Sequence, residues 1–136
     1  MTIKSKKKFK FIIEKTRTGF SAYSEDLPVY TVGGTMIELS SNILEAINYY
    51  FEEDDLLISP ANIILEFDLK QFFEYYRVIN AKFLAERIGM NETLLSSYVK
   101  GRKKPSKVQV DRILAGIHEI GLELSELRFV VNDPEK

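Results

Sequence analysis

Carboxylates supply most of the catalytic chemistry open to this chain, because its 136 residues include no cysteine and one histidine, His118. This excludes thiolate nucleophiles, disulfides, thiolate zinc sites and metal sites built from several imidazoles. The carboxylates on or beside expected strands are Glu14, Glu66 and Asp68, with Glu25 and Asp26 in a loop. Metal-dependent phosphodiester hydrolysis needs several such groups to converge, but Glu14 ends its strand and Asp68 occupies a helix-capping position. We therefore predict no catalytic residue, metal site, cofactor or enzymatic activity, with a nuclease as the alternative.

Recognition through charge is the second kind of chemistry that the sequence supports. The formal net charge is −1, but the charge is unevenly distributed. Residues 1–37 carry 7 basic and 3 acidic side chains, and residues 38–77 carry 2 basic and 9 acidic ones. Residues 78–112 carry 8 basic and 3 acidic side chains, and residues 113–136 carry 2 basic and 5 acidic ones. The block charges are therefore +4, −7, +5 and −3, which allows a basic and an acidic surface on one chain. Ordinary surface charge is the alternative. No segment has the length and apolarity of a membrane span or signal peptide, so a cytoplasmic location is expected.

The most informative pattern is the segment 80–101, NAKFLAERIGMNETLLSSYVKG. Asn80 and Asn91 are N-cap candidates, and Gly89 stands where a tight turn needs positive φ. Two helices joined by so short a turn cross steeply and leave one face of the second exposed, as in a helix-turn-helix. A third helix is expected from about Lys107 to about Gly121. Its inward side chains should be Val108, Ile113, Leu114 and Ile117.

The exposed face of the second helix and the basic loop after it predict a DNA-binding surface. Short polar side chains can approach base edges in the major groove, and cations can reach phosphates. The predicted DNA-binding residues are Glu92, Thr93, Ser96, Ser97, Lys100, Arg102, Lys103 and Lys104. The expected partner is palindromic double-stranded operator DNA, bound by a homodimer or homotetramer. A helical bundle with an ordinary short turn is the alternative.

The first half of the chain predicts a small sheet with one helix. Expected strands are Phe9–Ile13, Phe20–Ser24, Val29–Val32 and Asn62–Phe67, with a helix that begins after Thr35 and precedes the last strand. The predicted fold class is therefore α+β: a β-β-β-α-β domain over 1–67 followed by an all-α helix-turn-helix domain over 68–136. The segment Leu127–Val131 is interpreted as either a final strand, which could pair with a symmetry mate, or a tail.

The helix of the first half is acidic, and its carboxylates are the predicted partner-binding residues. Leu39, Ile43 and Ile47 form its apolar stripe. Tyr49 and Tyr50 are assigned to core and interdomain packing, with a dimer or partner surface as the alternative. The predicted partner-binding residues are Glu38, Glu45, Glu52, Glu53, Asp54 and Asp55. Complementary charge favours fast and selective encounter with a basic partner. A solvated helix face is the alternative interpretation.

Two family resemblances connect these observations. The spacing Leu84-Ala85-x-x-Ile88-Gly89-Met90, with the basic loop that leads to Pro105-Ser106, resembles the phage-repressor-like (Xre) helix-turn-helix over residues 69–122. This resemblance implies that Glu92, Thr93 and Ser97 occupy the base-reading positions. Many relatives carry Gln where this chain has Glu92, although a glutamate can accept a hydrogen bond from cytosine.

The first half resembles the N-terminal domain of HicB-type antitoxins. The shared features are the hairpin at Gly19-Phe20, the strand break at residues 26–28, the helix start at Gly34-Thr35 and the pair Glu45-Ala46 in the helix. The chain differs from the family at one place, where the family's Gly-Asp-Thr is replaced by Gly-Gly-Thr. It implies a truncated ribonuclease-H-like fold that neutralises a small RNA-cleaving HicA-like toxin. The expected function is thus a type II antitoxin that also represses its own operon. The alternative is a stand-alone transcription regulator whose first half dimerises or senses a ligand.

Overall fold

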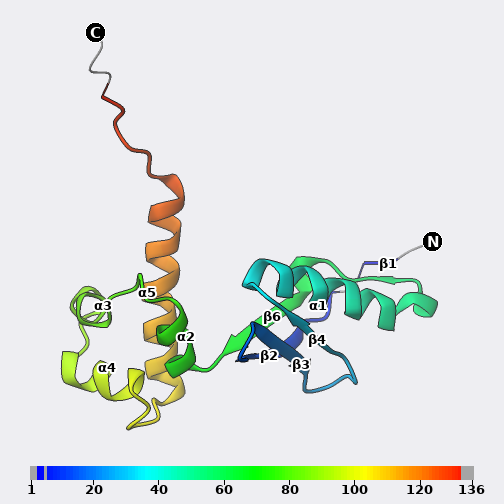
Figure 1. The fold of residues 1–136 in the computed structure, drawn as a ribbon, viewed down its shortest axis with the longest axis horizontal. Helices are drawn as coiled ribbons and strands as arrows, with labels where there is room; N and C mark the ends of the chain where they lie inside the picture. The colour runs from blue at the N-terminus through cyan, green and yellow to red at the C-terminus, as the bar shows by residue number, and fades with distance from the viewer. Residues whose placement is uncertain (1–2, 5, 133–136) are drawn as a thin grey trace. The chain divides into compact units, whose positions relative to one another are not determined.

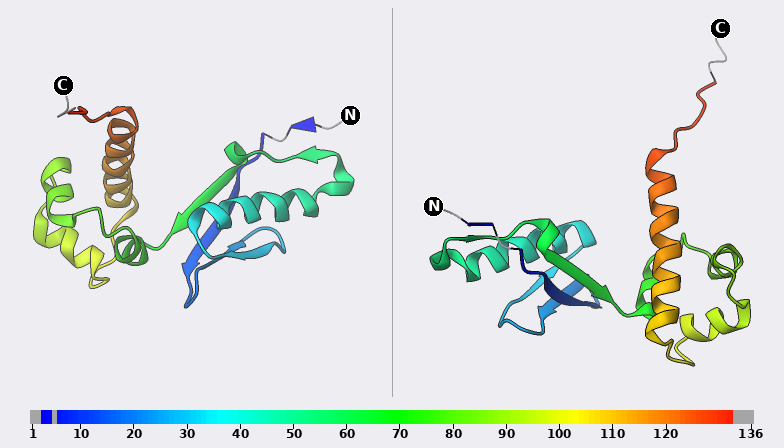
Figure 2. Two further views of the ribbon diagram at one scale, coloured as in Figure 1. Left: turned by 45° about the horizontal axis from the view of Figure 1, so that its top comes forward. Right: turned by 180° about the vertical axis from the view of Figure 1, so that it is seen from behind.

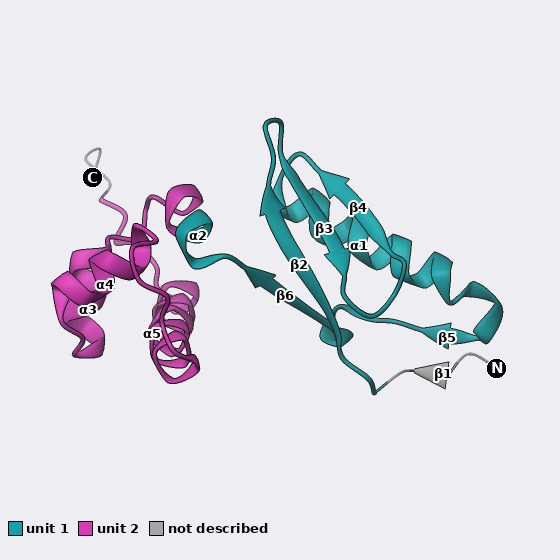
Figure 3. Ribbon diagram, turned by 90° about the horizontal axis from the view of Figure 1, so that it is seen from below, with its two compact units in different colours: residues 1–72 teal, residues 73–136 magenta. Residues whose placement is uncertain are grey.

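The computed structural model describes residues 3–4 and 6–132 and has an α+β fold, which confirms the predicted fold class (Figures 1 and 2). The chain divides into two compact units, residues 1–72 and 73–136 (Figure 3). The division falls inside helix α2 (Leu69–Tyr75), a few residues beyond the expected boundary at Phe67–Asp68. Within the described residues, no helix has the length and apolarity needed to cross a membrane.

Unit 1 is built on a four-stranded sheet in the order β4-β3-β2-β6. The strands are β2 (Phe9–Lys15), β3 (Phe20–Ser24), β4 (Tyr30–Gly33) and β6 (Ile63–Phe67). Strand β2 is antiparallel to β3 and parallel to β6, and β3 is antiparallel to β4. A separate parallel pair, β1 (Ile3–Lys4) with β5 (Leu56–Leu57), was not predicted.

Helix α1 (Met36–Tyr50) packs on one face of this sheet and closes the core of unit 1. Its N-cap is Thr35, whose Oγ1 accepts from the Glu38 N–H at 3.1 Å, while the Glu38 carboxylate accepts from the Gly34 N–H at 3.3 Å. The stripe Leu39, Ile43 and Ile47 is fully buried against the sheet, as predicted. Two 3-10 turns, η1 (Glu52–Asp54) and η2 (Pro60–Asn62), bring the chain from α1 back to the edge strand β6.

Unit 2 contains helices α3 (Ala81–Ile88), α4 (Glu92–Val99) and α5 (Lys107–Glu126), which follow α2. Each begins at a side-chain cap: Asn80, Asn91 and Ser106 accept from backbone N–H groups three residues later. Helix α5 continues through Gly121 to Glu126, beyond its expected end. Leu127–Asn132 has no regular structure, so no strand forms there in the described chain.

Two of the expected inward positions of α5 are wrong. Val108 is 69% exposed and Leu114 is 46% exposed, whereas Ile113 is buried. The reason is that α3 contacts a narrow strip of α5 around Gly116, where a Cβ would lie 2.3 Å from Cγ2 of Ile88. The apolar residues outside that strip lie on the surface of unit 2.

Candidate nucleic-acid and partner interfaces

The turn between α3 and α4 has the geometry of a helix-turn-helix. Helix α3 ends at Gly89, whose φ of 68° is left-handed, and the Met90 N–H donates back to the Ala85 carbonyl at 2.9 Å. Asn91 starts α4 two residues later by accepting from the Leu94 N–H at 3.0 Å. Gly89 is required here because side chains with a Cβ rarely adopt this conformation.

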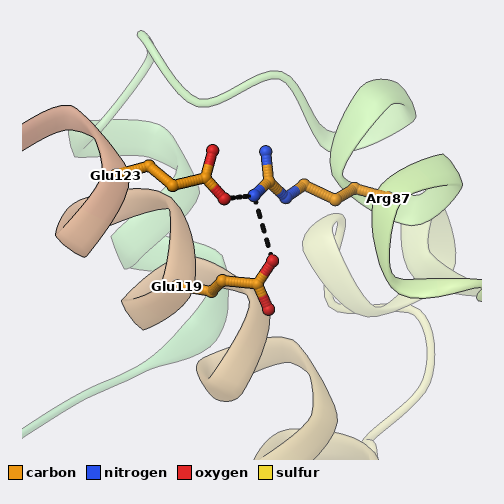
Figure 4. A network of polar contacts seen from close by, with 3 residues as sticks. All are labelled: Arg87, Glu119 and Glu123. Atoms are coloured by element: carbon orange, nitrogen blue, oxygen red, sulfur yellow. Dashed lines mark hydrogen bonds and ion pairs between the residues drawn. The ribbon is translucent and has the colours of Figure 1, made fainter. Parts of the chain in front are cut away.

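Two arginines hold this turn against α5. Nη2 of Arg112 donates to the carbonyls of Ile88 and Gly89 at 3.1 and 3.2 Å, so it satisfies acceptors that the end of α3 leaves open. Arg87 on α3 pairs with Glu119 at 3.0 Å and also with Glu123, both on α5 (Figure 4). The position of α4 is therefore fixed through α3 by polar contacts as well as by the buried side chains of the two helices.

The predicted base-reading residues lie together on one side of α4. At 100° per residue, the positions of Glu92, Thr93, Ser96, Ser97 and Lys100 fall within an arc of about 140°. Glu92, Thr93 and Lys100 are exposed, and the two serines are half-buried. The hydroxyl of Ser97 donates to the Leu94 carbonyl at 2.6 Å, which leaves this side chain only as an acceptor. Leu95 and Tyr98 face the interior of unit 2.

The basic loop after α4 has a defined backbone. Gly101 has a φ of 75°, and the N–H groups of Arg102 and Lys103 both donate to the Ser97 carbonyl, at 2.8 and 3.2 Å. Arg102, Lys103 and Lys104 are exposed, and none forms an ion pair with another described residue. Three cations held beside the polar face of α4 can contact phosphates while α4 lies in a groove.

Unit 1 has a second candidate interface, which we call the tyrosine groove. It is a cleft of about 610 Å³ between β4 and α1, lined by Pro28, Val29, Tyr30, Thr31, Asn42, Glu45, Ala46, Tyr49 and Tyr50. Tyr30 is 65% exposed and Tyr49 is 79% exposed. The assignment of Tyr49 to core packing is therefore wrong, since its side chain lies outside the buried stripe of α1. Its i, i+4 spacing from Glu45 was the signal that sequence reasoning missed.

The six predicted partner-binding carboxylates are all exposed, but they have different roles. Glu38 caps the start of α1, Glu45 lines the tyrosine groove, and Glu52–Asp55 follow the end of α1. Asp55 has a left-handed φ of 51° at the end of the turn η1. Only Glu45 therefore combines negative charge with a concave, aromatic surface.

The strand carboxylates line one shallow hollow of about 370 Å³, to which Glu14, Glu66 and Asp68 all contribute. Glu66 pairs with Lys10 at 3.5 Å, and Asp68 caps α2 by accepting from the Gln71 N–H at 3.1 Å. No cluster of three acidic or imidazole groups suited to a metal ion occurs among the residues that the structure describes.

Comparison with known protein families, with characterised proteins and with solved structures finds no match to this chain.

Proposed function

We propose that this protein is a cytoplasmic type II antitoxin of the HicB kind, which represses its own operon through unit 2 and neutralises a small RNA-cleaving toxin through unit 1. The observation that carries the proposal is the presence of two unlike recognition surfaces, one on each unit. The first is a polar helix face beside a basic loop, and the second is a groove lined by three tyrosines and one carboxylate, that of Glu45.

The DNA-binding part of the proposal depends on the geometry of α3 and α4. The three-residue turn 89–91 exposes the first turn of α4, where recognition helices contact base edges. Thr93 can donate to or accept from a base, and Glu92 can accept from cytosine. The fixed loop at Arg102 and Lys103 supplies phosphate contacts that set the register of the protein on the duplex.

The toxin-binding part depends on the tyrosine groove. Tyr30 and Tyr49 expose aromatic surface, and tyrosine and arginine are enriched at the centres of protein interfaces. An arginine or lysine of a basic partner could pair with Glu45 and lie over a tyrosine ring, which combines ionic and cation–π attraction. An RNA-cleaving protein needs basic residues to bind its substrate, so a partner that covers them would also block RNA access.

The test is co-expression with the small reading frame adjacent to the gene of this protein. We expect the neighbouring product alone to arrest growth, and co-expression of this chain to restore growth and allow the two proteins to co-purify. The double variant Glu45→Lys, Tyr49→Ala should lose both effects, while the exposed hairpin variant Arg17→Gln should retain them. A harmless neighbour that does not co-purify would overturn the antitoxin proposal and favour a stand-alone regulator.

A further inference from the structure

Helix α5 carries an apolar repeat that the fold of unit 2 does not use. Val110, Leu114, Ile117, Gly121 and Leu124 are separated by four, three, four and three residues. This spacing places all five on one stripe of the helix and is the spacing by which two helices pack along a common seam. We call these five positions the α5 seam.

Four of the five α5 seam positions are exposed on the surface of unit 2, and Ile117 at the centre is half-buried. Val110, Leu114 and Leu124 are 38%, 46% and 63% exposed, and no atom lies within 4 Å of the Cβ that a side chain at Gly121 would have. At 100° per residue, the centre of the seam is about a third of a turn from Gly116, the centre of the strip that contacts α3. The C-terminal part of α5 extends past the other helices of unit 2 (Figure 2).

We propose that the α5 seam is the interface through which this protein binds a second copy of itself. A seam with this repeat fits another helix of the same repeat, and a second copy supplies one by two-fold symmetry. No seam position is charged, so two copies can meet without burying like charges. The nearest ion pair, Lys107 with Asp111 at 2.9 Å, is satisfied within the same helix.

The apolar area available is of the size that a stable dimer needs. The segment after α5 adds four apolar side chains, Leu127, Phe129, Val130 and Val131, which are between 67% and 97% exposed. With roughly 80 Å² for each side chain, the seam and this segment offer on the order of 600 Å² per copy. A standard interface buries about 800 Å² per partner, part of it polar.

The dimer is inferred from α5 and the apolar segment that follows it, and only its consequence for DNA rests on the proposed function. A two-fold pair of chains carries two α4 helices, which is what a palindromic operator requires.

Sedimentation velocity of the full chain, without DNA or toxin, tests the seam. We compare the seam variant Leu114→Glu, Leu124→Glu with a matched control, Val108→Glu, Leu122→Glu, whose positions are 69% and 70% exposed on the same helix but outside the seam. The wild type and the control should sediment as dimers, and the seam variant should bind itself at least tenfold more weakly. A monomeric wild type, or seam and control variants that behave alike, would overturn the proposal.

A cross-linking experiment keeps the proposal testable if the glutamate variants fail to fold. Because the chain has no cysteine, Ile117→Cys introduces a single thiol at the centre of the seam. Residue 117 meets its counterpart in either helix orientation, so a short thiol-specific cross-linker should give a covalent dimer. Ala115→Cys, exposed on another side of α5, should not. Equal cross-linking of both variants, or none of either, would contradict the seam.

Discussion

In the proposed complex with DNA, we expect individual side chains on α4 and in the loop after it to divide between reading bases and holding phosphates. Thr93 is exposed in the first turn of α4 and its hydroxyl has no hydrogen bond to a described residue, whereas the Ser97 hydroxyl already donates to a backbone carbonyl. Thr93 is therefore the better test of base recognition. Lys103 sits in a loop whose backbone is fixed by the Ser97 carbonyl, so it should contact phosphate in any sequence.

Thr93→Ala should weaken operator binding by roughly 1–3 kcal/mol and reduce discrimination at one base pair. Lys103→Gln should weaken binding to all sequences alike and lower the slope of log affinity against log salt concentration by about 1. Fluorescence anisotropy with operator and scrambled duplexes at several salt concentrations measures both effects, with Arg17→Gln in unit 1 as the control. If both variants lost affinity in the same sequence-independent way, the orientation assigned to α4 would be incorrect.

Two glycines of α5 provide a matched test of the packing between α3 and α5. A Cβ at Gly116 would meet the Ile88 side chain at 2.3 Å, while one at Gly121 meets nothing within 4 Å. Gly116→Ala should lower the free energy of unfolding of unit 2 by about 1–3 kcal/mol through overpacking. Because Gly121 belongs to the α5 seam, both substitutions are compared in the seam variant Leu114→Glu, Leu124→Glu. Gly121→Ala should there raise the free energy of unfolding by roughly 0.5–1 kcal/mol, because alanine is the better helix former. Urea unfolding followed by circular dichroism measures both changes in the free energy of unfolding, which should have opposite signs. Equal changes for the two variants would contradict the close packing of α3 against α5 at Gly116.

At the scale of elements, the contacts between α3 and α5 set the presentation of α4. Arg112 binds the two carbonyls at the end of α3, where no intrahelical donor is available. Arg87 instead forms exposed ion pairs with Glu119 and Glu123. These two arginines connect the same helices through different physical interactions.

Arg112→Ala should destabilise unit 2 by about 1–2 kcal/mol, because it leaves helix-terminal carbonyls without their charged donor. Arg87→Ala should have a smaller effect, under about 1 kcal/mol, since solvent screens exposed ion pairs. Thermal unfolding at low and high salt distinguishes the two variants, because only the loss of stability caused by Arg87→Ala should become smaller as the salt concentration rises. A larger loss for Arg87→Ala at both salt concentrations would reverse this ranking.

Elements with strong local signals were predictable from the sequence. The caps Thr35, Asn80 and Asn91 and the left-handed Gly89 act at single positions, so the residue type identifies the local structure. The pairing of β1 with β5 joins segments far apart in the chain and has no local signal. The apolar periodicity of α5 was visible, but the sequence could not separate the strip against α3 from the α5 seam, because both are apolar.

The candidate partner site in the structure differs from the set of acidic residues predicted from the sequence. The predicted acidic residues share only their charge, and charge alone does not form a concave surface. The tyrosine groove depends on β4 lying beside α1, which places Tyr30 near Glu45 and Tyr49 from a separate part of the sequence. Local patterns describe each helix or strand but not which of them become neighbours.

At the scale of the whole molecule, a net charge of −1 conceals a division of charge along the chain. The −7 block contains most of α1, with the side of the tyrosine groove that α1 forms, and the +5 block contains α3, α4 and the basic loop. Electrostatic attraction acts through local surface potential rather than through the total. The two proposed ligands, a basic toxin and DNA, therefore have separate sites on one chain, and the binding of each should be separable by mutation.

The most direct test of this central claim measures both ligands on the same immobilised chain by biolayer interferometry. The ligands are the DNA upstream of its own gene and the neighbouring product. Thr93→Ala with Lys103→Gln should weaken DNA binding at least tenfold and leave binding of the neighbouring product unchanged. Glu45→Lys with Tyr49→Ala should do the reverse. If either pair of substitutions removed both activities, or neither pair affected its own ligand, the assignment of one surface to each partner would be contradicted.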